Sequence, residues 1–225
     1  MTAKGVDSSV RYFAHSEVRE SQSDMIEDGI ESLLSEGSLM ALAPTGIGKT
    51  AAALASAISV QRASSDNLKI LFLTSRQSQH RIVVDTVQKI NQKLGQTEPP
   101  IKLVDLIGRE GMCQNVDRMS GKCDCEDSLE GSMRDELRAD MQANILLKPT
   151  HVDDLIQNSR RINLCAWATA REAVKSCNIL VCDYNHVFID SVREASLPSM
   201  GVDIENTILI VDEAHNLPDR VRNGM

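Results

Sequence analysis

The stretch Ala43-Pro44-Thr45-Gly46-Ile47-Gly48-Lys49-Thr50 decides how the rest of the sequence is interpreted. It has the spacing of a P-loop, with alanine where the first glycine usually stands. Gly46 and Gly48 allow the backbone to curl so that its N–H groups face phosphate oxygens. The apolar run at 38–42 predicts a buried strand before the loop, and the stretch rich in alanine and leucine at 49–63 predicts a helix after it. The pattern therefore indicates a phosphate-binding turn at a helix N-terminus.

The residues of this loop have distinct expected roles. Lys49 is predicted to reach the β- and γ-phosphates of ATP, and Thr50 to ligate Mg²⁺. The other loop residues are expected to line the nucleotide site, namely Ala43, Pro44, Thr45, Gly46, Ile47 and Gly48. The alternative is a chance Gly-Lys-Thr turn, but the expected strand before it and helix after it favour the functional interpretation.

Further apolar runs at 69–73, 179–182 and 207–211 are predicted to be buried strands, and a weaker candidate spans 101–107. Each run is nearly continuous rather than alternating, which is typical of strands covered on both faces in a parallel sheet. Helical patterns lie between them, and the one at 81–94 places its apolar residues on one side. This alternation predicts an α/β fold with a parallel sheet.

The residues Asp212-Glu213-Ala214-His215 follow the last of these apolar runs. A carboxylate at the end of a buried strand lies where ligands bind in open α/β sheets. Asp212 is predicted to hold Mg²⁺ through water, and Glu213 to orient or deprotonate the attacking water. His215 is expected to sense the γ-phosphate. A solvated strand end with a capping aspartate is the alternative, and the P-loop favours the catalytic interpretation.

Between 108 and about 167 the alternation stops and the composition turns polar and acidic. This block contains Cys113, Cys123, Cys125 and Cys165. Four thiolates suit a 4Fe–4S cluster or structural zinc, and the spacing alone does not decide between them. Apolar residues at every fourth position from 129 to 145 predict an amphipathic helix, and Thr150 with Asp153 resembles a capping box. We expect an insertion with a small core of its own.

The motifs together resemble those of the DEAH-type helicases of superfamily 2. The segment Val18-Arg19-Glu20-Ser21-Gln22 is similar to their adenine-reading motif, with Gln22 as its glutamine, because an amide can donate to and accept from an adenine edge. The segment at 73–80 is similar to the one that contacts single-stranded DNA, and its hydroxyls, amides and Arg76 can bond to phosphates. The alternatives are a surface glutamine on a helix and a polar strand-to-helix loop.

The segment Cys165-Ala166-Trp167-Ala168-Thr169-Ala170-Arg171-Glu172 resembles the Cys-Pro-Tyr-x-x-Ala-Arg-Glu segment of the XPD family of iron–sulfur helicases. Alanine and tryptophan here replace the proline and tyrosine. As in that family, the insert falls between the P-loop and the DEAH box, and the segment at 182–186 is similar to the one after the cluster. The gap between Cys123 and Cys125 is shorter than in the family, so the second and third ligands stay open. Cys177 and Cys182 are predicted to be buried structural cysteines.

The resemblance implies an α/β fold in which a RecA-like P-loop domain with a parallel sheet is interrupted by a small, mostly helical iron–sulfur insert. The implied division is 1–108 for the first part of motor domain 1, 109–167 for the insert, and 168–225 for the second part through the DEAH box. It implies an ATP-dependent 5′→3′ DNA helicase that uses ATP, Mg²⁺ and a 4Fe–4S cluster on single-stranded or forked DNA. The second motor domain and the arch of that family are missing from the 225 residues, so we expect weak ATP binding and no unwinding by them alone.

The composition limits the function classes. With 42% hydrophobic and 25% charged residues, disorder throughout is excluded. A net charge of −8 and 3% aromatic residues argue against binding nucleic acid by bulk charge or by a stacked aromatic surface, but allow a local basic groove. No run approaches the roughly 18 apolar residues that span a bilayer, and no signal-peptide core is present, so we expect a cytoplasmic protein, or a nuclear one in a eukaryote, without a membrane partner.

Two other functions fit the same sequence. The first is a DEAH-type RNA-directed ATPase whose insert carries zinc, which metal analysis would distinguish from an iron–sulfur protein. The second is a nucleotide- or DNA-binding module without enzymatic activity, which ATP turnover stimulated by single-stranded DNA would exclude.

Overall fold

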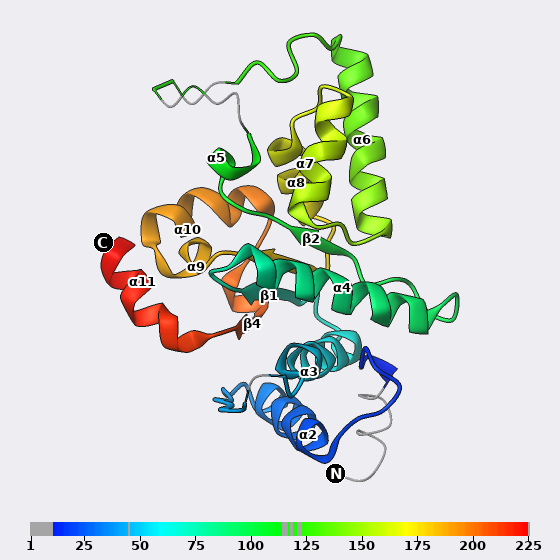
Figure 1. Cartoon of the computed structure of the whole chain (residues 1–225), viewed down its shortest axis with the longest axis vertical. Coiled ribbons are helices and arrows are strands. Elements are labelled where there is room, and N and C mark those ends of the chain that lie inside the picture. The colour runs from blue at the N-terminus through cyan, green and yellow to red at the C-terminus, as the bar shows by residue number, and fades with distance from the viewer. Residues whose placement is uncertain (1–10, 45, 114–116, 118, 121–122, 225) are drawn as a thin grey trace.

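The computed structural model describes residues 11–44, 46–113, 117, 119–120 and 123–224, so the predicted site residue Thr45 lies outside the described residues. One parallel sheet has the strand order β2-β3-β1-β4 (Figure 1). Its strands are β1 (Lys69–Leu73), β2 (Leu103–Asp105), β3 (Ile179–Cys182) and β4 (Thr207–Val211). The predicted α/β class is confirmed, and the weak strand candidate at 101–107 is β2.

Helices surround this sheet. Among the described residues none of them is long and apolar enough to traverse a lipid bilayer. The α-helices are α2 (Glu20–Leu34), α3 (Lys49–Ala63), α4 (Gln77–Leu94), α5 (Arg109–Met112), α6 (Gly131–Leu147), α7 (Val152–Arg161), α8 (Ala166–Val174), α9 (Asn185–Phe188), α10 (Asp190–Ser196) and α11 (Leu217–Gly224). Short 3-10 helices are η1 (Pro198–Met200), η2 (Ile204–Asn206) and η3 (Ala214–Asn216).

The two faces of the sheet are covered by different helices. Successive residues of a strand point to opposite faces. Ile70 and Phe72 of β1 belong to one apolar cluster together with residues of α3 and α4. Leu71 and Leu73 belong to another cluster together with residues of α7 and α8. All five residues of β1 are buried, which explains why residues 70–73 form a continuous apolar run, while the Lys69 ammonium donates to the Val174 carbonyl.

The cysteine-containing insert shares its core with the sheet. Ile145 of α6 and Leu155 of α7 lie in the same apolar cluster as Leu71 and Leu180 of the sheet. In Figure 1, α6, α7 and α8 lie together beyond β2, on the side of the sheet away from α3. The expectation of a separate small core is therefore wrong, because the apolar side of α7 faces the strands.

Two local predictions within the insert need correction. The helix predicted from 129 to 145 is α6, but Met133 is 56% exposed and only Ile145 of this helix is buried. A repeat of four residues drifts by about 40° per step on a helix of 3.6 residues per turn, so the apolar row winds away from the core. The N-cap of α7 is His151, whose side chain accepts from the Asp153 N–H, whereas the Thr150 hydroxyl donates to the Lys148 carbonyl.

The strand predicted at 38–42 does not form. Residues 37–44 have no regular secondary structure, and Met40 and Leu42 are 96% and 102% exposed. In the described part of the chain, β4 pairs only with β1 and no strand lies beside 38–42. A strand obtains its backbone hydrogen bonds from a neighbour, and residues 38–42 do not pair with the free edge of β4.

Candidate functional site

The P-loop residues that the structure describes form a left-handed turn into α3. Gly46 and Gly48 have φ values of 83° and 86°, a conformation that favours glycine. Gly48 is the N-cap of α3, so the free N–H groups of the first helical turn face the loop. The Lys49 ammonium donates to the carbonyl oxygens of Ala43, at 2.9 Å, and Pro44, at 3.1 Å. The lysine must leave these carbonyls in order to contact a phosphate.

Gln22 connects α2 to the P-loop. Its side-chain amide donates to the Ile47 carbonyl at 2.7 Å, and its Oε1 accepts from the Arg19 N–H at 2.9 Å. A Cβ on Gly48 would collide with this amide, so the close contact requires glycine at that position. Gln22 is 6% exposed. The predicted adenine-reading glutamine therefore lies against the phosphate loop, and its contact with adenine stays a prediction.

The DEAH residues follow β4 directly. The Asp212 N–H donates to the Leu73 carbonyl at 2.9 Å, which holds this aspartate at the carboxyl end of β1. Burial raises the pKa of Asp212, and the neighbouring Glu213 charge adds to this, while the Glu213 N–H and the Lys49 charge oppose it. The joint action of Lys49 and Asp212 on a nucleotide stays a prediction. Glu213 has a φ of 51°, and its carboxylate lies 3.4 Å from Nδ1 of His215.

Tyr184 is a residue of this site that the sequence analysis did not assign. Its hydroxyl donates to the main-chain carbonyl oxygens of Asp212 and, at 3.2 Å, of Glu213. Its side chain is fully buried directly after β3. Burial, followed by the charge of Asp212, raises the pKa of this phenol, so it stays a hydrogen-bond donor at neutral pH. In the sequence, the only indication of this role was a tyrosine, with its polar hydroxyl, shortly after an apolar strand.

The segment predicted to contact DNA lies between β1 and α4. Thr74 is buried, and Arg76 is the N-cap residue of α4. His80 is 2% exposed, and its Nδ1 lies 2.5 Å from the Asp105 carboxylate. The same carboxylate accepts from the Val152 N–H at 2.8 Å, so it joins α4 and β2 to the start of α7. This buried junction was not predicted, because its members are distant in sequence.

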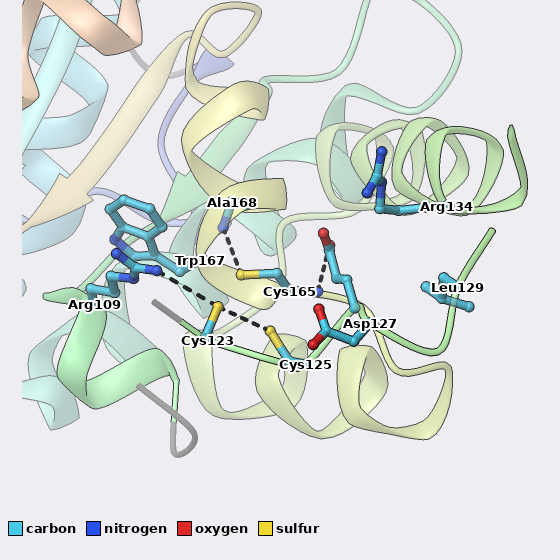
Figure 2. A pocket seen from close by; sticks show the side chains of 10 residues that line it. Arg109, Cys123, Cys125, Asp127, Leu129, Arg134, Cys165, Trp167 and Ala168 are labelled. Atoms are coloured by element: carbon cyan, nitrogen blue, oxygen red, sulfur yellow. Dashed lines mark hydrogen bonds between the residues drawn. The ribbon is translucent and has the colours of Figure 1, made fainter. Parts of the chain in front are cut away.

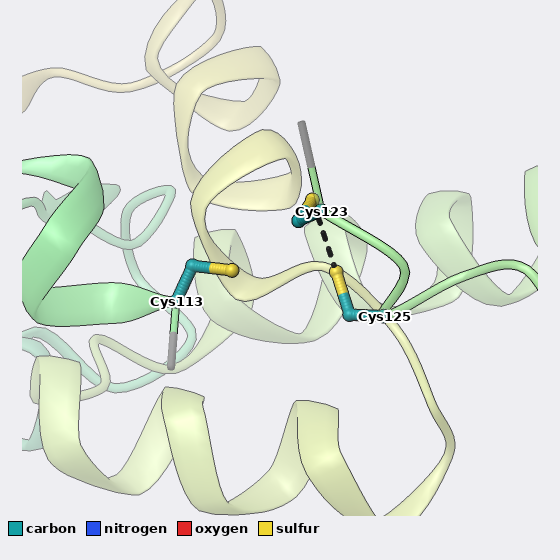
Figure 3. Close-up of side chains that lie close together, drawn as sticks. All are labelled: Cys113, Cys123 and Cys125. Atoms are coloured by element: carbon teal, nitrogen blue, oxygen red, sulfur yellow. Dashed lines mark hydrogen bonds between the residues drawn. The ribbon is translucent and has the colours of Figure 1, made fainter. Parts of the chain in front are cut away.

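The cysteines predicted as metal ligands converge at the end of the insert. The sulfur atoms of Cys113, Cys123 and Cys125 lie within 4.8 Å of one another (Figure 3). The Cys125 and Cys123 sulfurs are 3.4 Å apart. Cys165, the N-cap residue of α8, lies beside them, and its sulfur accepts a hydrogen bond from the Ala168 N–H at 3.4 Å (Figure 2). Cys125 and Cys165 line a cavity of about 410 Å³.

Charged side chains from three segments surround these sulfurs. The Arg109 guanidinium donates to the Cys123 sulfur at 3.6 Å and lies 4.9 Å from the ring centre of Trp167. Burial opposes ionisation of Cys123, but hydrogen bonds from Arg109 and the neighbouring cysteines outweigh it and lower its pKa. Glu126 accepts from the Cys165 N–H at 2.9 Å and pairs with Arg138 of α6 at 2.5 Å. Glu126 and Arg138 were not predicted.

The donor set fits a thiophilic metal centre. Four cysteine sulfurs and no carboxylate ligand are the donors of structural zinc and of iron–sulfur clusters. Tetrahedral zinc with bonds of about 2.3 Å places its sulfurs about 3.8 Å apart, which is close to the observed spacing. A four-iron cluster is larger and requires the sulfurs to lie further apart. Burial raises the pKa values of Cys125 and Cys165, and a bound cation would offset that cost of ionisation.

The two remaining cysteines lie in the interior, as predicted. Cys182 of β3 is fully buried, and Cys177 is 6% exposed. Burial raises the pKa of Cys177 to about 11, so its thiol is protonated at neutral pH. Both belong to the apolar cluster between the sheet and the insert.

Comparisons with known proteins agree with this architecture. A profile of the DEAD_2 family matches residues 49–225. The ATP-dependent DNA helicase chl1 of Schizosaccharomyces pombe is 27% identical over 168 residues, which are 68% of this chain and 19% of that protein. The ATP-dependent DNA helicase DDX11 of Danio rerio is 32% identical over 81 residues, or 36% of this chain and 9% of that protein. The chain thus spans about a fifth or less of these relatives.

A solved structure shares the fold. An XPD helicase aligns with 93% of this chain and 34% of its own chain, with a TM-score of 0.61 at 18% identity.

Proposed function

We propose that this chain, which belongs to the DEAD_2 family of XPD-type superfamily 2 helicases, forms the nucleotide-binding part of an ATP-dependent DNA helicase. The observation that carries this proposal is the placement of Asp212 directly after β4, with its N–H bonded to the Leu73 carbonyl at the carboxyl end of β1. We assign Asp212, at the carboxyl end of the sheet, to the metal ion, and Lys49, at the start of α3, to the phosphates. The division into motor segments 1–108 and 168–225 around the insert 109–167 belongs to this proposal.

The roles of the site residues follow from their positions. Lys49 and the N–H groups at the start of α3 bind the β- and γ-phosphates of ATP. The Thr50 hydroxyl and the Asp212 carboxylate are the oxygen donors that Mg²⁺ prefers, and this ion would neutralise phosphate charge. Glu213 accepts a proton from the attacking water, and His215 pairs with Glu213. Tyr184 fixes the backbone that carries both carboxylates.

Nucleotide binding tests this assignment directly. Lys49→Ala removes a charged hydrogen bond to phosphate, worth about 1.5–3 kcal/mol. At 1.4 kcal/mol per tenfold change, the dissociation constant of a fluorescent ATP analogue with Mg²⁺ should rise about 10- to 100-fold. Lys175→Ala is the control, because Lys175 pairs with Glu172 on the protein surface at the end of α8. Equal affinity in both variants would overturn the proposed site.

We further propose that the DNA strand runs across the loop that contains Arg76 and that translocation has 5′→3′ polarity. The loop follows β1, whose carboxyl end also contacts Asp212, so a strand bound there lies next to the nucleotide site. The polarity rests on the family resemblance. Duplex DNA with a single-stranded overhang at one end only, given to the whole helicase, tests the polarity. Unwinding from a 3′ overhang alone would contradict the proposal.

For the centre held by Cys113, Cys123, Cys125 and Cys165 we propose a 4Fe–4S cluster, supported by the four-thiol donor set and by the segment beginning at Cys165. The cluster would join the end of α5 to the start of α8 and so hold the insert rigid against the sheet. Cys113→Ser should abolish unwinding by the whole helicase while leaving nucleotide binding intact. Unwinding that survives the loss of the cluster would contradict this mechanical role.

Zinc is the second candidate for this centre. The observation that favours it is the sulfur spacing, since separations of 4.8 Å or less are nearer to those around a single tetrahedral ion. A zinc centre would hold the insert in the same way but would be colourless and redox-inactive. It would also favour the RNA-directed ATPase among the functions that the sequence allows.

A further inference from the structure

The serine at position 159 occupies a position where the fold calls for an apolar residue. The buried residues of α7 are Val152, Leu155, Ile156 and Ser159, which is the spacing of one helix face. This face packs in the cluster that covers the sheet. Ser159 is fully buried, so its hydroxyl has no access to bulk water.

The hydroxyl of Ser159 has no hydrogen-bond partner among the described residues. Buried serines on a helix usually donate to the carbonyl four residues earlier. Ser59 of α3 does this, with its hydroxyl 2.7 Å from the Ala55 carbonyl, and Ser56 donates to the Ala52 carbonyl at 3.1 Å. A buried hydroxyl without a partner is costly and rare in folded proteins, so a partner outside the protein is the physical expectation.

The space beside Ser159 leads to the cysteine centre. Ser159 lines a cavity of about 150 Å³ together with Cys113, Cys125 and Cys165. Cys125 and Cys165 also line the larger cavity on the Trp167 side, so the two spaces adjoin at these sulfurs. The acceptors around a metal centre of this kind are sulfur atoms, which accept hydrogen bonds at up to about 4 Å.

We propose that Ser159 donates a hydrogen bond to a sulfur atom of the inorganic centre held by Cys113, Cys125 and Cys165. This inference rests on the proposed centre and assigns to it a positioning residue on α7. No described cysteine sulfur is bonded to this hydroxyl in the structure, so the acceptor is a bridging sulfide in an iron–sulfur cluster, or a cysteine thiolate that metal binding moves toward α7 in a zinc centre. A hydrogen bond to sulfur stabilises the more negative state of the centre, and such partners typically contribute 10- to 100-fold to metal affinity.

The proposal predicts opposite effects of Ser159→Ala in the two states of the whole 225-residue chain. In the metal-free protein the substitution removes an unpartnered buried hydroxyl, so the melting temperature should not fall. In the protein loaded anaerobically with iron and sulfide, or with zinc, the variant should hold its metal about 10- to 100-fold less tightly against a chelator. In the iron form its reduction potential should also become more negative, because the reduced centre loses a donor.

Two further variants complete the experiment. Ser159→Thr keeps the hydroxyl and should restore metal retention. Ser59→Ala removes a paired hydroxyl far from the cysteines and should lower the melting temperature of both forms equally, with unchanged metal affinity. The proposal is overturned if Ser159→Ala retains metal as well as the wild type does, or destabilises the metal-free protein as much as Ser59→Ala does. The centre itself fails separately, if the wild-type chain takes up neither iron nor zinc.

Discussion

Asp105→Ala should be among the most destabilising single substitutions in this protein. The Asp105 carboxylate is fully buried, lies 2.5 Å from Nδ1 of His80, and accepts from the Val152 N–H at 2.8 Å. Its removal leaves both groups buried without their partner, each at a cost of about 1–3 kcal/mol. The two losses together cost about 2–6 kcal/mol. At about 2–4 °C per kcal/mol for a chain of this size, the melting temperature should fall by about 4–24 °C.

Urea unfolding with two signals measures this effect. The chain has one tryptophan, Trp167, which lies on α8 beside the cysteine centre, so its fluorescence reports on the insert while circular dichroism reports on all helices. Because the insert and the sheet share one core, the two transitions should coincide in the wild type. Asp85→Ala, on the exposed side of α4, is the control and should change stability by about 0.5 kcal/mol or less. A loss below about 1 kcal/mol for Asp105→Ala, or an earlier tryptophan transition in the wild type, would refute the reasoning.

Other substitutions test single contacts. Tyr184→Phe removes the hydroxyl that holds the DEAH backbone. It should weaken nucleotide binding about 2- to 10-fold, since one such hydrogen bond contributes about 0.5–1.5 kcal/mol. The control Tyr12→Phe loses a hydrogen bond to Glu98 far from the site and should leave nucleotide binding unchanged in the same titration. Asp212→Asn should raise the melting temperature at neutral pH, because burial raises the pKa of this carboxyl and its charge therefore destabilises the folded state. That gain should vanish as the pH falls below the ordinary aspartate pKa, where both states are protonated, and a gain that grows on acidification would contradict the sign. Met40→Ser should change the unfolding free energy by about 0.5 kcal/mol or less, because Met40 is exposed. Leu54→Ala in the core should lower the unfolding free energy by about 2–5 kcal/mol. A comparable loss of unfolding free energy for Met40→Ser would show that the 38–42 segment is packed.

The sequence predicted the parts of the fold that local patterns encode. The runs that became β1 and β3 are buried because helices cover both faces of the sheet there. The run at 207–211 also forms a strand, β4, but the prediction that it is buried was wrong, because β4 lies at the edge of the sheet, where only Ile208 is buried and Leu209 is 39% exposed. Gly46, Gly48 and Lys49 carry the phosphate turn in a single short motif, and α3 begins at the expected lysine. These features depend only on neighbours in the chain.

Long-range contacts were beyond local patterns. The run at 38–42 has strand composition, yet it does not pair with the free edge of β4 and forms no strand. Tyr184 and Asp105 act on backbone groups 28 and 47 residues away, which no spacing rule indicates. Thr150 fits a capping pattern, but His151 takes the N-cap because its side chain reaches the Asp153 N–H.

The four cysteines could be predicted to act together, but the metal that they bind could not. The grouping of these cysteines in a polar insert indicated a metal centre, and the structure brings Cys113, Cys123 and Cys125 together beside Cys165. The supporting residues Glu126 and Arg138 had no signal, because charged residues are common throughout the insert. The choice between iron and zinc depends on how far apart the sulfurs lie once the centre is bound.

Elemental analysis of the chain purified without oxygen tests the central claim most directly. We expect about four iron and four sulfide per chain, a brown solution, and loss of both in Cys165→Ser. One zinc per chain and no sulfide would contradict the iron–sulfur assignment but keep a cysteine centre. Neither metal in any preparation would contradict the claim that this nucleotide-binding sheet carries a thiol-held inorganic centre.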